Sequence, residues 1–348
     1  MTPSIIDATT SRFEPLKADI ITKAQSGEAT LALHDACLAD IPAFAAVEQV
    51  PAARPFEILR PNGRYVIFSW NAERLKYDVP SRALVGAVAP DVALLTEVDI
   101  GMARSGNRHT VDDLARPIGA GYVYGLEFAE LGIGDDREMI WHKGEANTFG
   151  YHGNAIVSRH ALHDPFVVRL DDGAHWFVGL ETADQRRIGF RNAVAARIGL
   201  GDAALWCVSA HFENRATPAT RADQAKRLVA ALDERTGPLP VIIGGDFNTS
   251  TLPNDANSLR RIFDDPSRIE PMFAVLREAG FEWHEANLPE PSCRTRPDGT
   301  PVGPFTKIDW FFTRGLSASD PATLAAVDSE RLAISDHEAL RVTVSSKA

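Results

Sequence analysis

The sequence predicts a mixed-sheet domain of the α/β or α+β class. Several short segments are rich in Val, Ile, Phe, Tyr and Trp and are bounded by turn residues, which is typical of strands. Helical patterns are fewer, and no internal repeat or low-complexity run is present. Because some of these strands follow one another directly while others are joined by helical stretches, the sheets are expected to be mixed.

In chain order, the predicted strands cover 64–70, 91–97, 121–128, 153–159, 175–181, 191–198, 204–211, 240–246, 307–313 and 339–345. The clearest predicted helix covers 221–235, where apolar residues recur at helical spacing and Thr220 is placed to cap the start. Weaker helical patterns cover 81–89 and 272–280.

Residues 1–61 differ in composition from the rest of the chain. They are rich in Ala, and the proline-containing stretch "PAARPFEILRPNG" connects them to the rest of the chain. We expect an N-terminal helical extension packed on the core, followed by the main domain at 62–348. The first residues lack a basic region followed by an apolar one, so no secretory signal is expected. No stretch reaches the roughly 20 apolar residues that a membrane-spanning helix needs, so no membrane anchor is expected.

Charge and cysteine content narrow the function classes. The formal net charge is −11, whereas proteins that grip long nucleic acids usually present a basic face. The acidity lowers the expectation of a polymeric nucleic-acid substrate and leaves a local basic groove open. The three cysteines are scattered, without metal or disulfide spacing, so a cytoplasmic location is the default expectation.

Polar residues stand where the apolar strands end or begin. The stretch "VIIGGDFNTS" (241–250), for example, runs from a buried pattern into Asp and Asn. Each such residue alone is an ordinary turn residue or a structural histidine. In a mixed sheet, however, strand ends and strand starts can share one rim. The set comprises Asn71, Glu97, His211, Asp246, Asn248, Asp309, Asp336 and His337.

The chemistry of this set favours a site over a collection of turns. Carboxylate and carboxamide oxygens are the ligands of Mg²⁺ and Mn²⁺. Histidine is the side chain best suited to move protons near neutral pH. Oxygen ligands and histidines without cysteines therefore fit metal-assisted hydrolysis better than zinc binding.

The order of the motifs "SWN", "LLTEVD", "GNAIVSR", "SAHFE", "GGDFN", "KIDWFF" and "SDHEAL" resembles the endonuclease/exonuclease/phosphatase superfamily, with its DNase I-like fold. The resemblance runs from about residue 62 to 346. It implies an α+β fold, a four-layer αββα sandwich of two mixed β-sheets flanked by helices, with the site at the sheet rim. It also implies hydrolysis of a phosphoester by in-line attack of water, with Mg²⁺ or Mn²⁺ as cofactor.

The resemblance assigns a role to each residue of the set. Glu97 is expected to be a metal ligand with Asn71 beside it, and Asp336 a second ligand. Asp246 would orient or deprotonate the attacking water. Asn248 would bind a phosphate oxygen or support a neighbouring side chain. One metal or two is left open.

The two histidines of the set are expected to act on the phosphate group, by proton transfer or by stabilising its charge. His337 would pair with Asp309, which fixes the imidazole tautomer, and would act as base or as a charge stabiliser. His211 would protonate the leaving oxygen or bind phosphate, with Glu127 orienting it. The candidate substrate-binding residues are Arg191 and Asn154, the second with His152 nearby.

Two polar stretches are candidates for substrate recognition. Residues 99–119 follow Glu97 and would form either a recognition loop with a basic tip or a solvated loop leading into a helix capped by Thr110. The residues that would form the tip are Arg104, Asn107, Arg108 and His109. The second stretch, 291–307, contains Arg294 and Arg296.

Three function classes follow. The favoured one is a phosphoesterase that acts on a phosphodiester or phosphomonoester of a small or lipid-derived substrate. The alternative is a DNA or RNA nuclease on the same fold, for which a basic groove with stacking aromatics would be expected. A non-catalytic binding module is disfavoured, because no expected site residue has been replaced. No obligate protein partner is evident.

Overall fold

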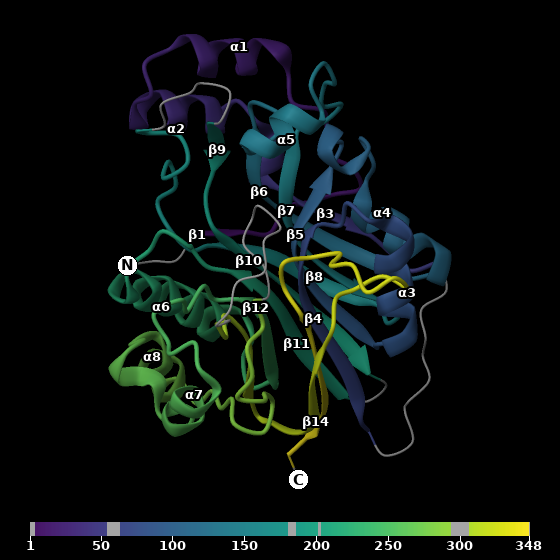
Figure 1. Ribbon diagram of the computed structural model, residues 1–348, viewed down its shortest axis with the longest axis vertical. Helices are drawn as coiled ribbons and strands as arrows, with labels where there is room; N and C mark the ends of the chain where they lie inside the picture. The colour runs from purple at the N-terminus through teal and green to yellow at the C-terminus, as the bar shows by residue number, and fades with distance from the viewer. Residues whose placement is uncertain (1–3, 54–62, 180–185, 201–202, 294–305, 348) are drawn as a thin grey trace.

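Two mixed β-sheets pack face to face, and helices cover their outer faces (Figure 1). The computed structural model describes residues 4–53, 63–179, 186–200, 203–293 and 306–347. Within them the chain forms the four-layer α+β arrangement, so the predicted fold class is confirmed. None of the helices that the structure describes has the length and apolar character needed to cross a bilayer.

The six-stranded sheet carries one half of the polar rim. Its spatial order is β1 (Ser4–Ile6), β8 (Leu162–Arg169), β10 (Asn192–Leu200), β11 (Ala203–His211), β12 (Val241–Asp246) and β13 (Asp309–Arg314). β11 and β12 are parallel, whereas β13 is antiparallel to β12. The ends of β11 and β12 therefore lie beside the start of β13.

The nine-stranded sheet carries the other half. Its order is β14 (Leu316–Leu324), β15 (Ala339–Ser346), β4 (Tyr65–Arg74), β5 (Val92–Ile100), β7 (Tyr151–Ser158), β6 (Gly121–Glu130), β3 (Val47–Val50) and β2 (Thr9–Thr10), with β9 (Arg187–Gly189) paired to β6. β4 and β5 are parallel, and β15 is antiparallel to β4. This combination of a parallel and an antiparallel pair brings the ends of β4 and β5 beside the residues that precede β15.

Alternation along the strands builds the layers. In β4, Ile67 joins the apolar core between the sheets, whereas Phe68 and Trp70 face the outer cluster. That outer cluster includes residues of α3 (Asp78–Val88) and α4 (Thr110–Ala115). On the far side, α6 (Pro218–Arg235) and α8 (Met272–Glu278) cover the six-stranded sheet, with α7 (Ala256–Ile262) next to them (Figure 1).

The N-terminal segment contributes both helices and strands. α1 (Ala18–Ser26) buries Ile20 and Ala24, and α2 (Leu31–Ala39) begins at Thr30, whose side chain accepts a hydrogen bond from the backbone of Leu33. In addition, β1 joins the six-stranded sheet, while β2 and β3 join the nine-stranded one. The remaining short elements are α5 (Asp136–Trp141), η1 (Pro42–Ala45), η2 (Ala103–Ser105), η3 (Arg116–Ile118) and η5 (Pro266–Arg268).

Some predicted elements were wrong. Residues 175–179 of the predicted strand 175–181 form turns, and 180–181 lie outside the described residues. The helix predicted at 221–235 begins earlier, at Pro218, because Thr217 rather than Thr220 accepts the capping hydrogen bond. β8 and β14 were missed because each contains Asp-Pro or Pro beside polar residues. In β14, proline is tolerated since this strand lies at the sheet edge and is bulged between Ser319 and Ala322.

Candidate active site

The polar strand ends of the two sheets meet at one place. Asn71, at the end region of β4, donates a hydrogen bond of 3.0 Å from Nδ2 to Oδ2 of Asp246, which ends β12. The same Nδ2 also donates to Oε1 of Glu97 on β5, at 3.2 Å. Both asparagine and aspartate are buried. The rim predicted from the strand pattern therefore exists, and it joins residues of both sheets.

His337 and Asp309 form a buried pair beside Asp246. Nδ1 of His337 lies 2.8 Å from Oδ2 of Asp309, and its Nε2 lies 3.7 Å from Oδ2 of Asp246. Asp309 faces Asp246 directly in the register of β12 and β13. Although burial disfavours the imidazolium, Asp309 and the neighbouring carboxylates raise the pKa of His337 well above its ordinary value.

Asn248 supports Asp246 from a tight turn. Its backbone N–H donates to Oδ1 of Asp246 at 2.8 Å, and its Nδ2 donates to the carbonyl of Phe212 at 2.9 Å. Its φ of 50° lies in the left-handed region, which asparagine tolerates better than most residues. Burial raises the pKa of Asp246, and the charge of Asp309 adds to the rise while His337 opposes it. Of the two expected roles of Asn248, its contacts favour support of a neighbouring side chain.

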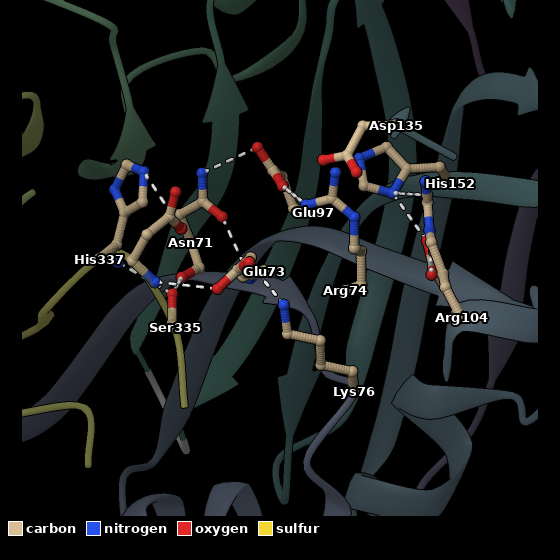
Figure 2. Close-up of polar contacts among 12 residues, drawn as sticks. Asn71, Glu73, Arg74, Lys76, Glu97, Arg104, Asp135, His152, Ser335 and His337 are labelled. Atoms are coloured by element: carbon tan, nitrogen blue, oxygen red, sulfur yellow. Dashed lines mark hydrogen bonds and ion pairs between the residues drawn. The ribbon is translucent and has the colours of Figure 1, made fainter. Parts of the chain in front are cut away.

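Glu97 and Asp336 form the side of the site at which a metal was predicted. Oε1 of Glu97 accepts from Asn71, and its Oε2 accepts from Nη1 of Arg74 at 3.0 Å (Figure 2). Burial disfavours the carboxylate of Glu97, but Arg74 and then His211 outweigh burial and hold its pKa well below the ordinary range. Burial raises the pKa of Asp336 to about 7, and the charges of nearby Glu73 and Glu97 add to the rise.

Glu73 and Arg74 were missed by the sequence analysis. Glu73, Arg74 and Leu75 have φ angles of 40°, 73° and 50°, and the β4–β5 register is interrupted between Asn71 and Arg74. This left-handed run turns the side chain of Glu73 towards Asp336, whose backbone N–H it accepts at 3.0 Å. Without a glycine to mark the turn, the sequence offers no signal for it beyond adjacency to Asn71.

His211 lies on the other side of Asp246, and its Nε2 is 3.7 Å from Oδ2 of that residue. Its Nδ1 lies 3.1 Å from Oε2 of Glu127, so the predicted contact between His211 and Glu127 is present. Burial lowers the pKa of His211, but the charge of Glu127 more than compensates and raises it. Nη1 of Arg191 lies 3.0 Å from Nδ1 of His211 and 2.5 Å from Oε1 of Glu127.

A family model described as "Endonuclease/Exonuclease/phosphatase family" matches residues 68–337, which include this whole arrangement. The chain belongs to the endonuclease/exonuclease/phosphatase family. That family consists largely of hydrolases that act on phosphoester bonds. No curated protein gives a significant match to the chain.

Solved structures of the endonuclease/exonuclease/phosphatase family share the fold. One from Beutenbergia cavernae DSM 12333 is 19% identical, with a TM-score of 0.56 over 82% of this chain and 72% of that chain. One from Bacteroides vulgatus is 13% identical, with a TM-score of 0.53 over 82% and 99%. A humanized D. rerio TDP2 is 16% identical, with a TM-score of 0.50 over 82% and 100%. At these identities the likeness concerns the fold alone.

The family's expected divalent cation fits the carboxylates at this rim. Burial and mutual repulsion already disfavour the charge on Asp336, and a cation held by Glu97 and Asp336 would relieve that repulsion. Asn71 turns its Nδ2 rather than its oxygen towards the carboxylates, so in this arrangement it bridges Glu97 and Asp246. A second group with ligand atoms within 4.8 Å of one another comprises Asp246, Asp309 and His337.

The two residues predicted to bind substrate, Arg191 and Asn154, are both buried. Nε of Arg191 donates to Glu213 at 2.9 Å. Asn154 is fully buried and donates to Glu127 and Asn192. Its role in substrate binding stays a prediction. Glu213, which was not singled out from the sequence, anchors Arg191.

The residues predicted to form a basic tip in the 99–119 stretch do not form one, because Arg104 and Arg108 turn inwards. Arg104 is buried and donates to Asp99 at 2.9 Å and 3.0 Å. Arg108 donates to the backbone carbonyls of residues 75 and 76, at 2.8 Å and 3.2 Å. His109 rather than Thr110 caps α4, because Thr110 donates its hydroxyl to the carbonyl of Asp99 instead.

The remaining predictions about substrate contacts concern His152, Asn107, Arg294 and Arg296. His152, expected near the site, joins the buried Asp99–Arg104 pair, with its Nδ1 2.8 Å from Oδ1 of Asp99. Asn107 is tied to the neighbouring segment, where it donates to the carbonyl of Ala146 at 3.0 Å. Arg294 and Arg296 lie outside the described residues.

Proposed function

We propose that this protein is a divalent-metal-dependent phosphoesterase that hydrolyses a phosphodiester or phosphomonoester by in-line attack of water. One observation carries the proposal. Oδ2 of Asp246 lies 3.7 Å from Nε2 of both His211 and His337 and accepts a hydrogen bond from Asn71. A single carboxylate thus faces two groups that can carry protons and the candidate metal ligands, which supports in-line hydrolysis of a phosphoester.

The contacts of Asp246 support its role as the residue that orients or deprotonates the attacking water. Its raised pKa brings the carboxylate closer to the range in which a base accepts a proton efficiently. Asn248 would keep it in place through the backbone hydrogen bond to Oδ1. If Asp246 only closed a turn, the two histidines beside it would have no explanation.

The two histidines would act on opposite sides of the phosphate group. The raised pKa of His337 favours the imidazolium, and therefore the role of charge stabiliser over that of base. Asp309 would hold its ring through Nδ1, so that Nε2 faces the site. His211 would bind phosphate or protonate the leaving oxygen. Arg191, whose Nη1 lies 3.0 Å from Nδ1 of His211, would add positive charge beside the phosphate.

Glu97 and Asp336 would hold Mg²⁺ or Mn²⁺, with Asn71 beside them. When bound, the cation would neutralise phosphate charge and favour deprotonation of water. The group of Asp246, Asp309 and His337 is the competing location for a cation. We favour the first location because the carboxylates of Glu97 and Asp336 are more accessible, at 21% and 18% exposure, than the side chains of Asp309 and His337, at 3% and 7%.

The substrate we favour is small or lipid-derived. The net charge of −11 and the inward-turned side chains of Arg104 and Arg108 support this choice over a polymeric nucleic acid. A DNA or RNA nuclease on the same site is the alternative. We propose a cytoplasmic location for this protein.

An activity panel tests the proposal. The full-length protein should be assayed on bis-p-nitrophenyl phosphate, p-nitrophenyl phosphate, a phospholipid, supercoiled plasmid, an abasic duplex and RNA, each with Mg²⁺, Mn²⁺ or EDTA. We expect hydrolysis of at least one of the first three, and none with EDTA. Cleavage confined to the nucleic acids would replace the favoured substrate class by the alternative. No hydrolysis of any substrate, or activity that EDTA leaves intact, would contradict the proposed function.

A further inference from the structure

Arg74 occupies a strained turn that directs its guanidinium at Glu97. It is the middle residue of the left-handed run from Glu73 to Leu75, with a φ of 73°. Such angles are unfavourable for residues that carry a Cβ atom, and they persist only where the surroundings enforce them. This run begins two residues after Asn71, where the β4–β5 register is interrupted. The backbone distortion therefore places a cation at the metal side of the proposed site.

The guanidinium of Arg74 pairs with two carboxylates at once. Its Nη1 donates to Oε2 of Glu97 at 3.0 Å (Figure 2). Its Nε lies 2.7 Å from Oε1 of Glu138. The side chain is only 13% exposed, so the charge is poorly screened by solvent. Each carboxylate also accepts a hydrogen bond from another residue: Glu97 from Asn71, and Glu138 from Arg104.

The contact with Glu138 is an anchor that does not depend on Glu97. Glu138 belongs to α5, where a capping box with Asp135 fixes its carboxylate. Its Oε2 also lies 3.2 Å from Nη1 of Arg104, which is buried and holds Asp99 and Glu130. Arg74 is therefore tied from behind to a buried network of ion pairs. Loss of the contact with Glu97 would not release it into solvent.

We propose that Arg74 is a positioning residue that acts as an internal counter-cation for Glu97 and competes with the divalent cation for that carboxylate. The inference rests on the proposed function, in which Glu97 is a metal ligand. A cation arriving at Glu97 meets an oxygen that already accepts from Arg74. Because Glu138 keeps the guanidinium nearby, the repulsion between the two cations persists after binding. Arg74 thereby weakens divalent-cation binding while it holds Glu97 in the geometry of the site.

The test measures Mn²⁺ affinity by titration calorimetry on the full-length protein. We expect Arg74→Gln to bind Mn²⁺ at least about tenfold more tightly than the natural protein. Arg74→Lys, which keeps the charge, should stay within about threefold. The matched control is Arg187→Gln: Arg187 is 15% exposed and pairs with buried Glu130 at 2.9 Å, without contact to Glu97, so its change should also stay within about threefold.

The direction of the change separates this role from a structural one. Damage to the site would weaken Mn²⁺ binding, whereas loss of a competing charge strengthens it. Unchanged or weaker binding by Arg74→Gln, with the thermal melt of the natural protein, would overturn the inference for Arg74 alone. Failure of every variant and of the natural protein to bind Mn²⁺ would overturn the proposed metal site as well.

A second variant keeps the test decisive if Arg74→Gln does not fold. Arg74→Gly removes the same charge and suits the φ of 73°, because glycine adopts left-handed angles without strain. We expect its Mn²⁺ affinity to rise at least about tenfold. An unchanged or lower affinity in folded Arg74→Gly would overturn the inference.

Discussion

Nδ2 of Asn71 donates a 3.0 Å hydrogen bond to Oδ2 of Asp246, and this bond spans the two sheets. Asn71 comes from the nine-stranded sheet and Asp246 from the six-stranded one. Since both residues are buried, the bond fixes how the two halves of the site face one another. The expectations below concern the residues on either side of it.

Asp246 is expected to be indispensable to turnover. Because it is the carboxylate placed to act on water, Asp246→Ala should lower kcat on the best substrate of the panel by at least about 10²-fold. Steady-state kinetics with saturating Mn²⁺ measures this. Asp223→Ala is the control, because Asp223 is 68% exposed on α6 and should leave kcat unchanged. Near-normal turnover of folded Asp246→Ala would refute the assignment.

His337 and Asp309 are expected to act as one unit. His337→Ala should lower kcat at least about 10²-fold, and Asp309→Asn should lower it through loss of the 2.8 Å contact that orients the ring. The double variant should be no slower than His337→Ala alone within about threefold, since residues of one unit are not additive. The kcat values of the natural protein, the two single variants and the double variant together form a double-mutant cycle. Fully multiplicative losses would mean that the two side chains work independently.

Divalent cation should stabilise the fold as well as support activity. With Mn²⁺ at 100 times its Kd, the free energy of unfolding should rise by about 2.7 kcal/mol. Thermal melts with and without EDTA measure this. Glu97→Gln should remove most of the increase, whereas Glu145→Gln, 52% exposed and away from these carboxylates, should retain it. An equal Mn²⁺ effect in Glu97→Gln would place the cation elsewhere, with the group that contains Asp309 as the next candidate.

Glu213 should contribute stability that is lost in acid. Burial opposes its charge, but Arg191 outweighs burial and lowers the pKa of Glu213 from its ordinary 4.5 to about 2. A lowered folded-state pKa gives stability that is full above pH 4.5 and fades as the pH falls towards 2. The corresponding free energy is on the order of 3 kcal/mol.

Urea unfolding of the natural protein and of Glu213→Gln between pH 7 and pH 3 checks this expectation. The gap in unfolding free energy should be widest near neutral pH and should narrow below pH 4.5. Glu282→Gln is the control, because Glu282 is 64% exposed, and its gap should stay small at every pH. A gap for Glu213→Gln that does not change with pH would show that its charge is not the stabilising feature.

Gly245, next to Asp246, should not tolerate a side chain. Its φ is 148°, and a Cβ atom would lie 2.0 Å from the carbonyl oxygen of Ala210. Gly245→Ala should therefore destabilise the protein by about 3 kcal/mol or more, from strain and a backbone clash together. Gly199→Ala on β10 is the matched control, because its Cβ would meet only His163, at 3.7 Å. Similar urea midpoints for the two variants would contradict this account.

Much of the site could be predicted because it follows from the strand pattern. Apolar runs that end or begin in Asn71, Asp246 or Asp309 place these residues at sheet edges, and the mixed pairing of strands then brings the edges together. Motif order placed the chain in its family, and the family model confirms that prediction.

Contacts that depend on side-chain direction could not be predicted. Arg104 stands in a polar loop that suggested a basic tip, yet three buried carboxylates draw it inwards. Those partners come from positions up to 34 residues away, so neither spacing nor composition reveals them. The strained turn at Arg74 is likewise invisible, because non-glycine residues adopt left-handed angles only when tertiary contacts hold them there.

The sequence by itself determined the fold class and which polar residues lie at the sheet rim, since strand patterning is a local property that repeats every two residues. Only the tertiary structure decided which cations face the site and which are buried behind it. That choice depends on ion pairs such as Arg74 with Glu97 and Glu138, whose free energy arises when distant strands and helices exclude water together.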